Sequence, residues 1–270
     1  MPSTRNSTLR SIMLTMTLIA THISKFGIVQ ASDSNLTAGG QNAGPGRKVF
    51  DLPFGPGALA VAGSYSVEGR DMDEWMADCI AAYGAGGRPT LPGFAEQLRV
   101  RLSSELTSEE RDHLTLIHIA GYVDDPACTH PVLLFVRNIK GINRDGSYMW
   151  PGMKECQLSE DFWARDFFYN SNTRLALSTG GWHSYFNGFP EGRIAYLYLT
   201  RALNAFFKQL WSVPGWQFRR PASLEEIGRF AELELRAMDV MFRSSDYPAQ
   251  YIGGEPQVRL IEPPRAAIRF

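Results

Sequence analysis

The sequence TLIATHISKFGIVQASD, residues 17–33, decides the expected fold and function of this 270-residue chain. Its β-branched and apolar residues predict a strand over residues 17–24, a tight turn at 25–27 and a returning strand over 28–32. A second pair of short strands is expected over 48–52 and 58–62, separated by the turn PFGPG. The chain therefore opens with two strand pairs, and polar residues stand at their ends.

Three of these polar residues supply complementary chemistry. Thr17 offers a hydroxyl nucleophile, Asp33 a carboxylate and Lys48 an ammonium group. A threonine at the start of a chain also carries its own base, because its α-amine has a pKa near 8. A nearby lysine would lower the pKa of that amine, and a carboxylate would orient the lysine. This combination suits a hydrolase that attacks with an N-terminal threonine, provided that residues 1–16 are absent or removed.

The rest of the chain alternates between helical and strand patterns in blocks. Apolar residues at spacings of three and four predict helices over 71–83, 94–106, 194–211 and 223–242, with capping boxes at Thr107/Glu110 and Ser223/Glu226. Further strands are expected over 114–123, 131–137, 174–178 and 257–261, a glycine-rich loop over 38–47, and a short helix over 159–167. Runs of strands followed by runs of helices favour a layered α+β protein over an alternating βαβ one.

The opening segment resembles a known group. TLIATHISKFGIVQASDSNLT is similar to the start of proteasome β subunits and of the related bacterial ATP-dependent peptidase, which are N-terminal nucleophile hydrolases. In that family an aspartate follows the first threonine by sixteen residues, as Asp33 follows Thr17, and a lysine follows a little beyond thirty, near Lys48. The family glycine whose N–H forms the oxyanion hole matches Gly63 in ALAVAGS.

Later segments match the family more weakly. LALSTGGWHSY is similar to its Gly-Ser-Gly-Gly segment, which places Thr179 at a serine near the nucleophile. YIGGEPQVRLI resembles its terminal strand pair, but Ile252 stands where serine is common. Ala249 stands where proteasome subunits have a supporting aspartate, and Asp246 is three residues away. The bacterial peptidase does without that aspartate, so activity is still expected.

The resemblance implies a four-layer αββα sandwich formed by a single domain over residues 17–270. It also implies a threonine-type endopeptidase: Thr17 Oγ attacks, its amine is the base, Lys48 tunes that amine, Asp33 orients Lys48 and the Gly63 N–H holds the oxyanion. Members of the family assemble into homo-oligomeric rings, commonly supplied with unfolded protein by an AAA+ ATPase. The apolar helix over 194–211 is a candidate surface for such self-association.

Residues 1–16 show no clear structural pattern. They are interpreted as a propeptide removed by self-processing, or as lying upstream of a true start at Met16, whose removal would expose Thr17.

Composition limits the other function classes. A net charge of −1 gives no reason to expect binding to nucleic acid or to an anionic membrane. Three scattered cysteines favour a reducing compartment, and we expect a cytoplasmic protein. The histidines and cysteines lack metal-ligand spacing, so neither a metal nor a cofactor is expected.

Two alternatives to a peptidase stay open. One is an amidohydrolase that acts on a small amide, consistent with the aromatic insert over 139–173. The other is a non-catalytic, proteasome-like assembly subunit, which is favoured if the N-terminus stays blocked.

Overall fold

The structure is a computed structural model of the chain. It describes residues 14–15, 17–38, 41–124, 129–140, 143, 148–149, 157–162, 177–215, 219–246 and 252–265. Its strands are β1 (Leu14–Thr15), β2 (Leu18–Ser24), β3 (Gly27–Ser32), β4 (Asn35–Ala38), β5 (Gln41–Pro45), β6 (Val49–Leu52), β7 (Gly57–Ser64), β8 (Ser66–Val67), β9 (Arg70–Asp71), β10 (Thr115–Asp124), β11 (Thr129–Arg137), β12 (Gln157–Phe162), β13 (Trp182–Gly188) and β14 (Gln257–Ile261). Its helices are α1 (Met72–Gly84), α2 (Leu91–Glu105), α3 (Ser108–Arg111), α6 (Pro190–Ser212) and α7 (Leu224–Arg243).

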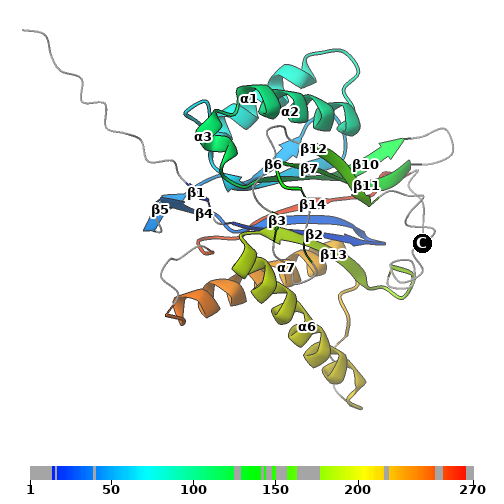
Figure 1. The fold of residues 1–270 in the computed structure, drawn as a ribbon. Helices are drawn as coiled ribbons and strands as arrows, with labels where there is room; N and C mark the ends of the chain where they lie inside the picture. Colours follow the sequence, from blue (N-terminus) through cyan, green and yellow to red (C-terminus); the bar gives the residue numbers. More distant parts are fainter. Residues whose placement is uncertain are drawn as a thin grey trace, which may run out of the picture.

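Two antiparallel sheets form the centre of the molecule (Figure 1). The larger sheet has the order β1-β7-β10-β11-β12, with β6 also paired to β7, and the smaller has the order β13-β2-β3-β14. Every residue of β2 and β3 is buried, which explains why both strands are so rich in apolar and small residues. The turn between them requires Gly27, because φ is +139° and a Cβ there would lie 2.5 Å from the carbonyl oxygen of Ile261.

Each large sheet is covered by its own pair of helices. Side chains of α1 and α2, including Trp75, Phe94 and Leu98, pack with those of β7, β10 and β11 in one apolar cluster. Side chains of α6 and α7, including Tyr196 and Leu235, pack with Leu18 and Ala20 of β2 in another. Because side chains alternate along a strand, Leu18, Ala20 and His22 face these helices, whereas Ile19, Thr21 and Ile23 face the other sheet.

The four-layer αββα sandwich expected from the sequence is wrong as a description of this fold. The described strands form four antiparallel sheets of six, four, two and two strands, not two sheets alone. The physical reason lies partly in residues 38–47, which were expected as a glycine-rich loop. Most of this segment forms the β4–β5 hairpin, in which Gly44 has a positive φ of 109°. A second hairpin, β8–β9, precedes α1.

Most of the other expected elements are confirmed, with shifts at their ends. The strand pair β10–β11, the four long helices, the capping box at Thr107 and the N-cap at Ser223 are all present. Three expectations are wrong. Residues 159–162 of the expected short helix belong to strand β12, and residues 177–178 are helical instead of extended. Strand β13 falls where no strand was expected, while residues 163–176 lie outside the described part of the chain.

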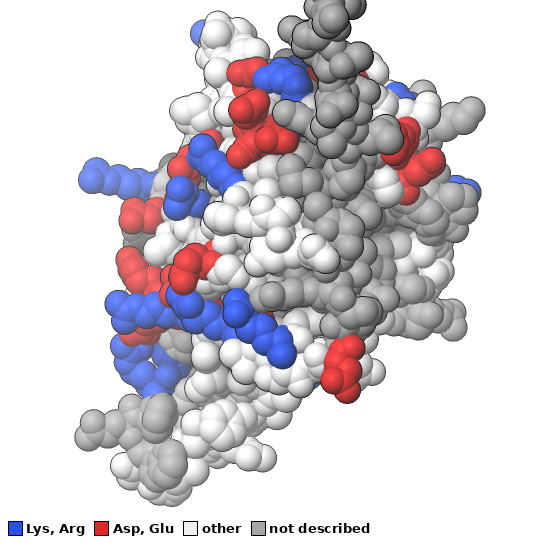
Figure 2. Space-filling view, turned by 90° about the vertical axis from the view of Figure 1, so that its left-hand side faces the viewer, with Lys and Arg blue, Asp and Glu red and all other residues white. Residues whose placement is uncertain are grey.

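The face of the molecule in Figure 2 carries no single dominant charge. On the face in Figure 2, basic and acidic side chains lie next to one another around a largely uncharged centre. Among the described residues, no helix combines the length and the apolar character that crossing a bilayer requires.

Candidate active site

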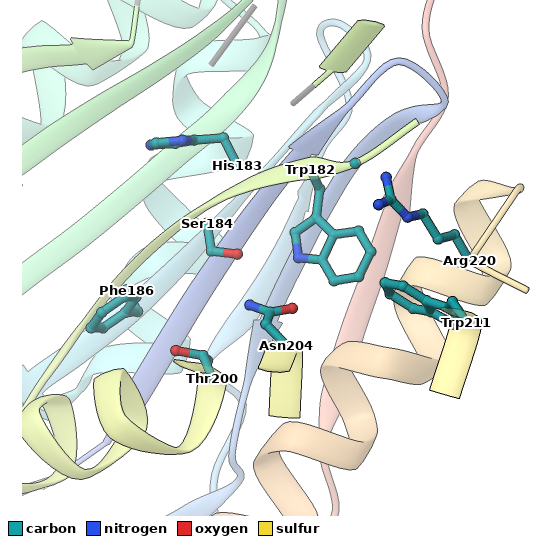
Figure 3. Close-up of a pocket in the computed structure, with 9 residues that line it drawn as sticks. Trp182, His183, Ser184, Phe186, Thr200, Asn204, Trp211 and Arg220 are labelled. Atoms are coloured by element: carbon teal, nitrogen blue, oxygen red, sulfur yellow. The ribbon is translucent and has the colours of Figure 1, made fainter. Parts of the chain in front are cut away.

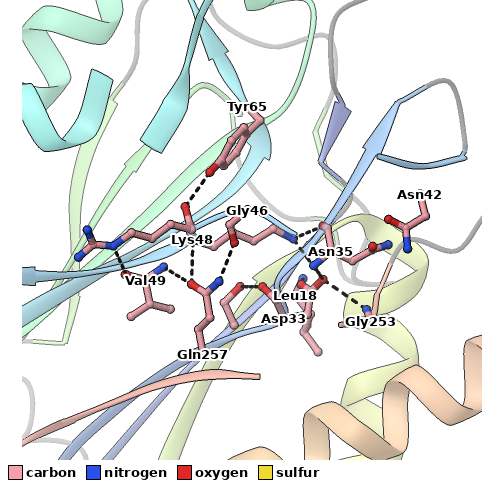
Figure 4. Close-up of polar contacts among 12 residues, drawn as sticks. Leu18, Asp33, Asn35, Asn42, Gly46, Lys48, Val49, Tyr65, Gly253 and Gln257 are labelled. Carbon is pink, nitrogen blue, oxygen red and sulfur yellow. Dashed lines mark hydrogen bonds and ion pairs between the residues drawn. The ribbon is translucent and has the colours of Figure 1, made fainter. Parts of the chain in front are cut away.

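Asp33 and Lys48 form a fully buried ion pair at the end of the smaller sheet (Figure 4). Asp33 follows β3, Lys48 precedes β6, and the Lys48 Nζ lies 3.1 Å from Asp33 Oδ2. The side chains are only 2% and 0% exposed. Lys48 Nζ also donates to the carbonyl oxygen of Asn35. A buried pair of this kind persists only when its remaining hydrogen-bonding capacity is also satisfied.

The carboxylate of Asp33 is held by three backbone N–H groups from separate segments. Leu18 donates to Oδ1 at 3.0 Å, and Asn35 and Gly253 donate to Oδ2 at 3.1 and 3.4 Å. The Gly253 carbonyl oxygen in turn accepts the N–H of Ser34 and of Asn35. Asp33 thus joins the residue that follows Thr17, the lysine loop and the C-terminal segment.

Lys48 is fixed from the other side by Gln257, the first residue of β14. The Gln257 Oε1 accepts the backbone N–H groups of Lys48 and Val49 at 2.8 and 3.0 Å, and its Nε2 donates to the Gly46 carbonyl at 2.6 Å. This clamp holds the backbone on both sides of Lys48, so the ammonium group points back toward Asp33 (Figure 4).

Burial determines the protonation behaviour of the pair. Desolvation lowers the pKa of Lys48, and the negative charge of Asp33 opposes this change. Desolvation likewise raises the pKa of Asp33, against the opposing charge of Lys48 and its backbone donors. A lysine whose pKa is lowered exchanges its proton more readily near neutral pH than a surface lysine does.

Thr17 is buried one residue before the Leu18 N–H that binds Asp33. Its Oγ1 is shielded from solvent and has no hydrogen-bond partner among the described residues. The residue itself is fixed through its backbone: its carbonyl oxygen accepts the N–H of Phe189 at 3.2 Å, and the next N–H is held by Asp33. Buried hydroxyls are normally bonded, so an unbonded one whose neighbouring N–H is held by a buried ion pair is a candidate reactive group.

Gly63 lies near the end of β7, at a position that only glycine can occupy. Its φ is +104°, and a Cβ would lie 1.8 Å from the carbonyl oxygen of Leu114. Strand β1 lies along this part of β7, with Thr15 opposite Gly63 and Leu14 opposite Ser64. Leu14 and Thr15 therefore lie as an extended strand beside the glycine expected to supply the oxyanion hole.

The structure does not bring Thr179 to these residues. Thr179 is exposed, in a turn before β13, and its neighbour Gly180 lies near the Lys25 side chain. Along the antiparallel pair, Trp182 is opposite Ser24 and Gly188 is opposite Leu18. Thr179 is therefore at the far end of β2 from Thr17, about 20 Å away at 3.3 Å per residue. Its assignment to the site needs correction.

The segment that does lie beside Thr17 is the junction of β13 and α6. A Cβ on Gly188 would lie 2.1 Å from the Thr17 carbonyl oxygen, and Phe189 donates to that same oxygen. Tyr148 accepts the Gly188 N–H at 3.1 Å and donates to its carbonyl oxygen. The sequence signal was a glycine shortly before Pro190, the first residue of α6, which is a common place for proline in a helix.

The structure describes two of the three C-terminal residues that the comparison with the resembling family singled out. Ile252 is fully buried and precedes the Gly253 that binds Asp33, so an apolar residue fits there. Asp246 is exposed after α7, whereas Ala249 lies outside the described residues. The sequence did not single out Asn35, Gly253 or Gln257 as site residues.

No protein-family model matches the sequence, and no curated protein matches it at a significant level. Within the described residues, no cluster of three or more histidine, cysteine, aspartate or glutamate side chains could hold a metal ion.

Proposed function

We propose that this chain is a threonine-type peptidase whose nucleophile is the hydroxyl of Thr17 once Thr17 is the first residue. The observation that carries the proposal is the position of Asp33. One carboxylate binds the Leu18 N–H, directly after Thr17, and the Lys48 ammonium group, both at hydrogen-bonding distance. The residue after the proposed nucleophile, the lysine proposed to tune its amine and the carboxylate that orients this lysine are therefore joined at one buried point, an arrangement that nucleophilic catalysis can use.

In the proposed reaction the free α-amine of Thr17 takes the proton of its own hydroxyl. Oγ1 attacks the carbonyl carbon of the peptide, and the C–N bond breaks after the amine returns the proton to the leaving nitrogen. Water then attacks the acyl–threonine ester and restores the hydroxyl. Lys48 keeps the pKa of the amine low through its positive charge, and Asp33 fixes the position of Lys48. The backbone N–H of Gly63 is the proposed oxyanion donor.

Strand β1 supports a peptide as the substrate. Leu14 and Thr15 lie antiparallel to β7 with residue pairs at Gly63 and Ser64. An extended peptide added to the same edge would make the same backbone hydrogen bonds, which is a common mode of peptide recognition. This is the reason to favour a peptide over the small amide of the alternative hypothesis.

The same strand supports the second candidate, a non-catalytic subunit. While residue 16 is joined to Thr17, the nitrogen of Thr17 is an amide and is not a base. A chain that retains β1 on β7 would therefore be inactive, and it would act only through assembly. The two candidates differ in a single observable, the identity of the first residue of the mature chain.

Self-association is a further part of the proposal. Three large apolar side chains on or just after α6 are strongly exposed: Tyr198 at 65%, Phe206 at 53% and Val213 at 38%. In Figure 1 the C-terminal half of α6 extends away from the sheets. Such a surface is typical of an interface between copies. The ring and the ATPase partner stay predictions from the resemblance.

The experiment that tests the function compares two preparations. One begins at Thr17, released from a cleavable fusion, and the other retains residues 1–16 with Met16→Pro to prevent removal. Hydrolysis of fluorogenic peptides by the first alone supports the proposal. Equal hydrolysis by both would refute it.

A further inference from the structure

A second group of reactive side chains lies on the opposite face of the smaller sheet. His22 of β2 and Ser184 of β13 are directly opposite one another in the strand pairing. They therefore project from the same face, the one that packs against α6 and α7, whereas Thr17 and Thr21 belong to the other face. The group is separated from Thr17 by the sheet and by the five positions from Thr17 to His22, or about 17 Å.

Ser184, His22 and Glu234 lie in a row of close polar contacts. Ser184 Oγ lies 2.7 Å from His22 Nδ1. His22 Nε2 lies 3.4 Å from Glu234 Oε2, on α7, which is within ion-pair distance but without hydrogen-bond geometry, and Tyr196 donates its hydroxyl to the same oxygen at 2.5 Å. His22, Glu234 and Tyr196 are each at most 1% exposed. Apart from the serine, the polar groups of this row are thus removed from water.

The two ring nitrogens of His22 have different surroundings. Nε2 is the one nearer to a carboxylate, so we place the ring proton there and leave Nδ1 to accept the Ser184 hydroxyl proton. This is the order nucleophile, base and orienting acid that activates a serine. Tyr196 holds Glu234 in place, and the Trp182 ring packs edge-on against the imidazole with centroids 6.5 Å apart.

The serine opens into a cavity. Ser184 lines a space of about 380 Å³ between β13 and α6, which is within the usual range for small-molecule sites. Figure 3 shows its hydroxyl on the same side of the strand as Asn204 and Thr200, while His183 points to the other side. Trp182, Phe186 and Trp211 give the cavity aromatic walls, and the Arg220 guanidinium lies over the Trp211 ring at 5.3 Å.

We propose that Ser184, His22 and Glu234 form a second nucleophilic site, which hydrolyses esters of small acids with a flat apolar group. Ser184 Oγ attacks the acyl carbon as its proton passes to His22 Nδ1, and Glu234 balances the imidazolium charge. The C–O bond to the alcohol breaks as His22 returns the proton to the leaving oxygen. Water then attacks the acyl–serine with the same base, which releases the carboxylic acid and restores Ser184. The Asn204 amide is the side chain placed to donate to the oxyanion.

The test uses an aryl-tagged fluorophosphonate, which phosphonylates activated serines. All samples carry Thr17→Ala, so that labelling of Thr17 makes no contribution. We expect one label per chain, mapped by peptide mass spectrometry to Ser184, and no label at this position in Ser184→Ala. His22→Gln is expected to slow labelling at least about 100-fold. Ser104→Ala, on α2, and His113→Gln, just after α3, are the matched controls and keep the full rate.

Phenyl acetate hydrolysis measured on the same samples is expected to follow the labelling. Unfolding temperatures by circular dichroism identify any variant that fails to fold, and the peptide map of the chain with Ser184 and His22 intact does not depend on those variants. Absence of label at Ser184 in that chain would overturn the proposal. So would equal labelling rates in folded His22→Gln and His113→Gln.

Discussion

The side-chain oxygen of Gln257 accepts the backbone N–H of Lys48 at 2.8 Å, across 209 positions of the sequence. The same side chain also binds Val49 and Gly46. One glutamine thus holds the backbone on both sides of Lys48, and the position of the lysine proposed to tune the Thr17 amine depends on strand β14.

Gln257→Leu is expected to lower stability by about 1–3 kcal/mol, because it leaves three backbone groups without partners. It should also reduce peptide hydrolysis by more than the loss of folded protein explains, since Lys48 would no longer be held. Urea unfolding and initial rates at one concentration of folded protein measure the two effects. Gln257→Glu keeps the acceptor and should recover part of the loss.

Arg259→Gln is the matched control on the same strand. Arg259 is about half exposed and pairs with the exposed Asp51, so its loss should change neither quantity appreciably. Identical behaviour of Gln257→Leu and Arg259→Gln would contradict the role of Gln257.

The buried ion pair predicts a strong coupling between its members. Lys48→Met or Asp33→Asn alone leaves one buried charge unpaired and is expected to cost about 3–5 kcal/mol. The double variant should cost less than the sum of the two by at least about 1 kcal/mol, because it removes both charges. Each variant should abolish peptide hydrolysis. Urea denaturation of the four proteins gives the coupling free energy.

The exposed pair Arg70 and Asp78 provides the comparison. Its side chains are 45% and 65% exposed, so water screens their attraction. The corresponding double-mutant cycle should show no measurable coupling. Additive losses at Lys48 and Asp33 would contradict the account of a buried pair.

His118 predicts a dependence of stability on pH. Burial between the two large sheets lowers the pKa of His118 to about 3, from about 6.5 in an unfolded chain. Its ring nitrogens contact the Thr21 hydroxyl at 2.9 Å and the Asn187 amide at 2.8 Å. Between pH 6.5 and 3 only the unfolded chain binds this proton. Stability should therefore rise with pH across that window, by up to about 1.4 kcal/mol per pH unit, and this contribution should be constant above it.

His118→Gln removes this contribution, so its stability should fall less steeply than that of the parent between pH 6 and 4. His113→Gln, at a half-buried site, serves as the control. Parallel pH profiles for the parent and His118→Gln, measured by urea unfolding, would show that His118 is not kept neutral in the folded state.

Gly63 predicts a large steric effect. Gly63→Ala places a methyl group against the Leu114 carbonyl oxygen at a positive φ, and it is expected to cost more than about 3 kcal/mol or to prevent folding. Gly69→Ala is the matched control, because Gly69 also has a positive φ, of 72°, but open space around it. Its expected cost is about 1 kcal/mol, the strain alone. Equal unfolding midpoints for the two variants would contradict the close contact at Gly63.

The sequence predicted the part of the site that local spacing controls. Thr17 and Asp33 stand at the two ends of one hairpin, so the strand and turn lengths alone bring Asp33 back to Leu18. The position of Lys48 was predicted in the same way, because Lys48 directly precedes β6, an expected strand that pairs with β7. The helices around this centre were predicted equally well, since their apolar periodicity is strong.

Contacts that depend on distant segments could not be predicted in this way. Gln257 and Gly253 reach Lys48 and Asp33 only because β14 pairs with β3, and nothing within either segment specifies that partner. Thr179 was misplaced for a related reason. Its STGG segment looks like a site turn by itself, but the register of β13 on β2 decides that Gly188 and not Thr179 lies at Thr17. The prediction of a sandwich built from two sheets was wrong partly because the glycine-rich residues 41–45 form a strand that pairs with β4.

The most direct test of the central claim is the rate of peptide hydrolysis by a chain whose first residue is Thr17, with intact mass measured on the same sample. We expect hydrolysis by this chain and its complete loss in Thr17→Ala with the same N-terminus. Hydrolysis that survives in Thr17→Ala, or that proceeds at the same rate while residues 1–16 are still attached, would contradict Thr17 as the nucleophile.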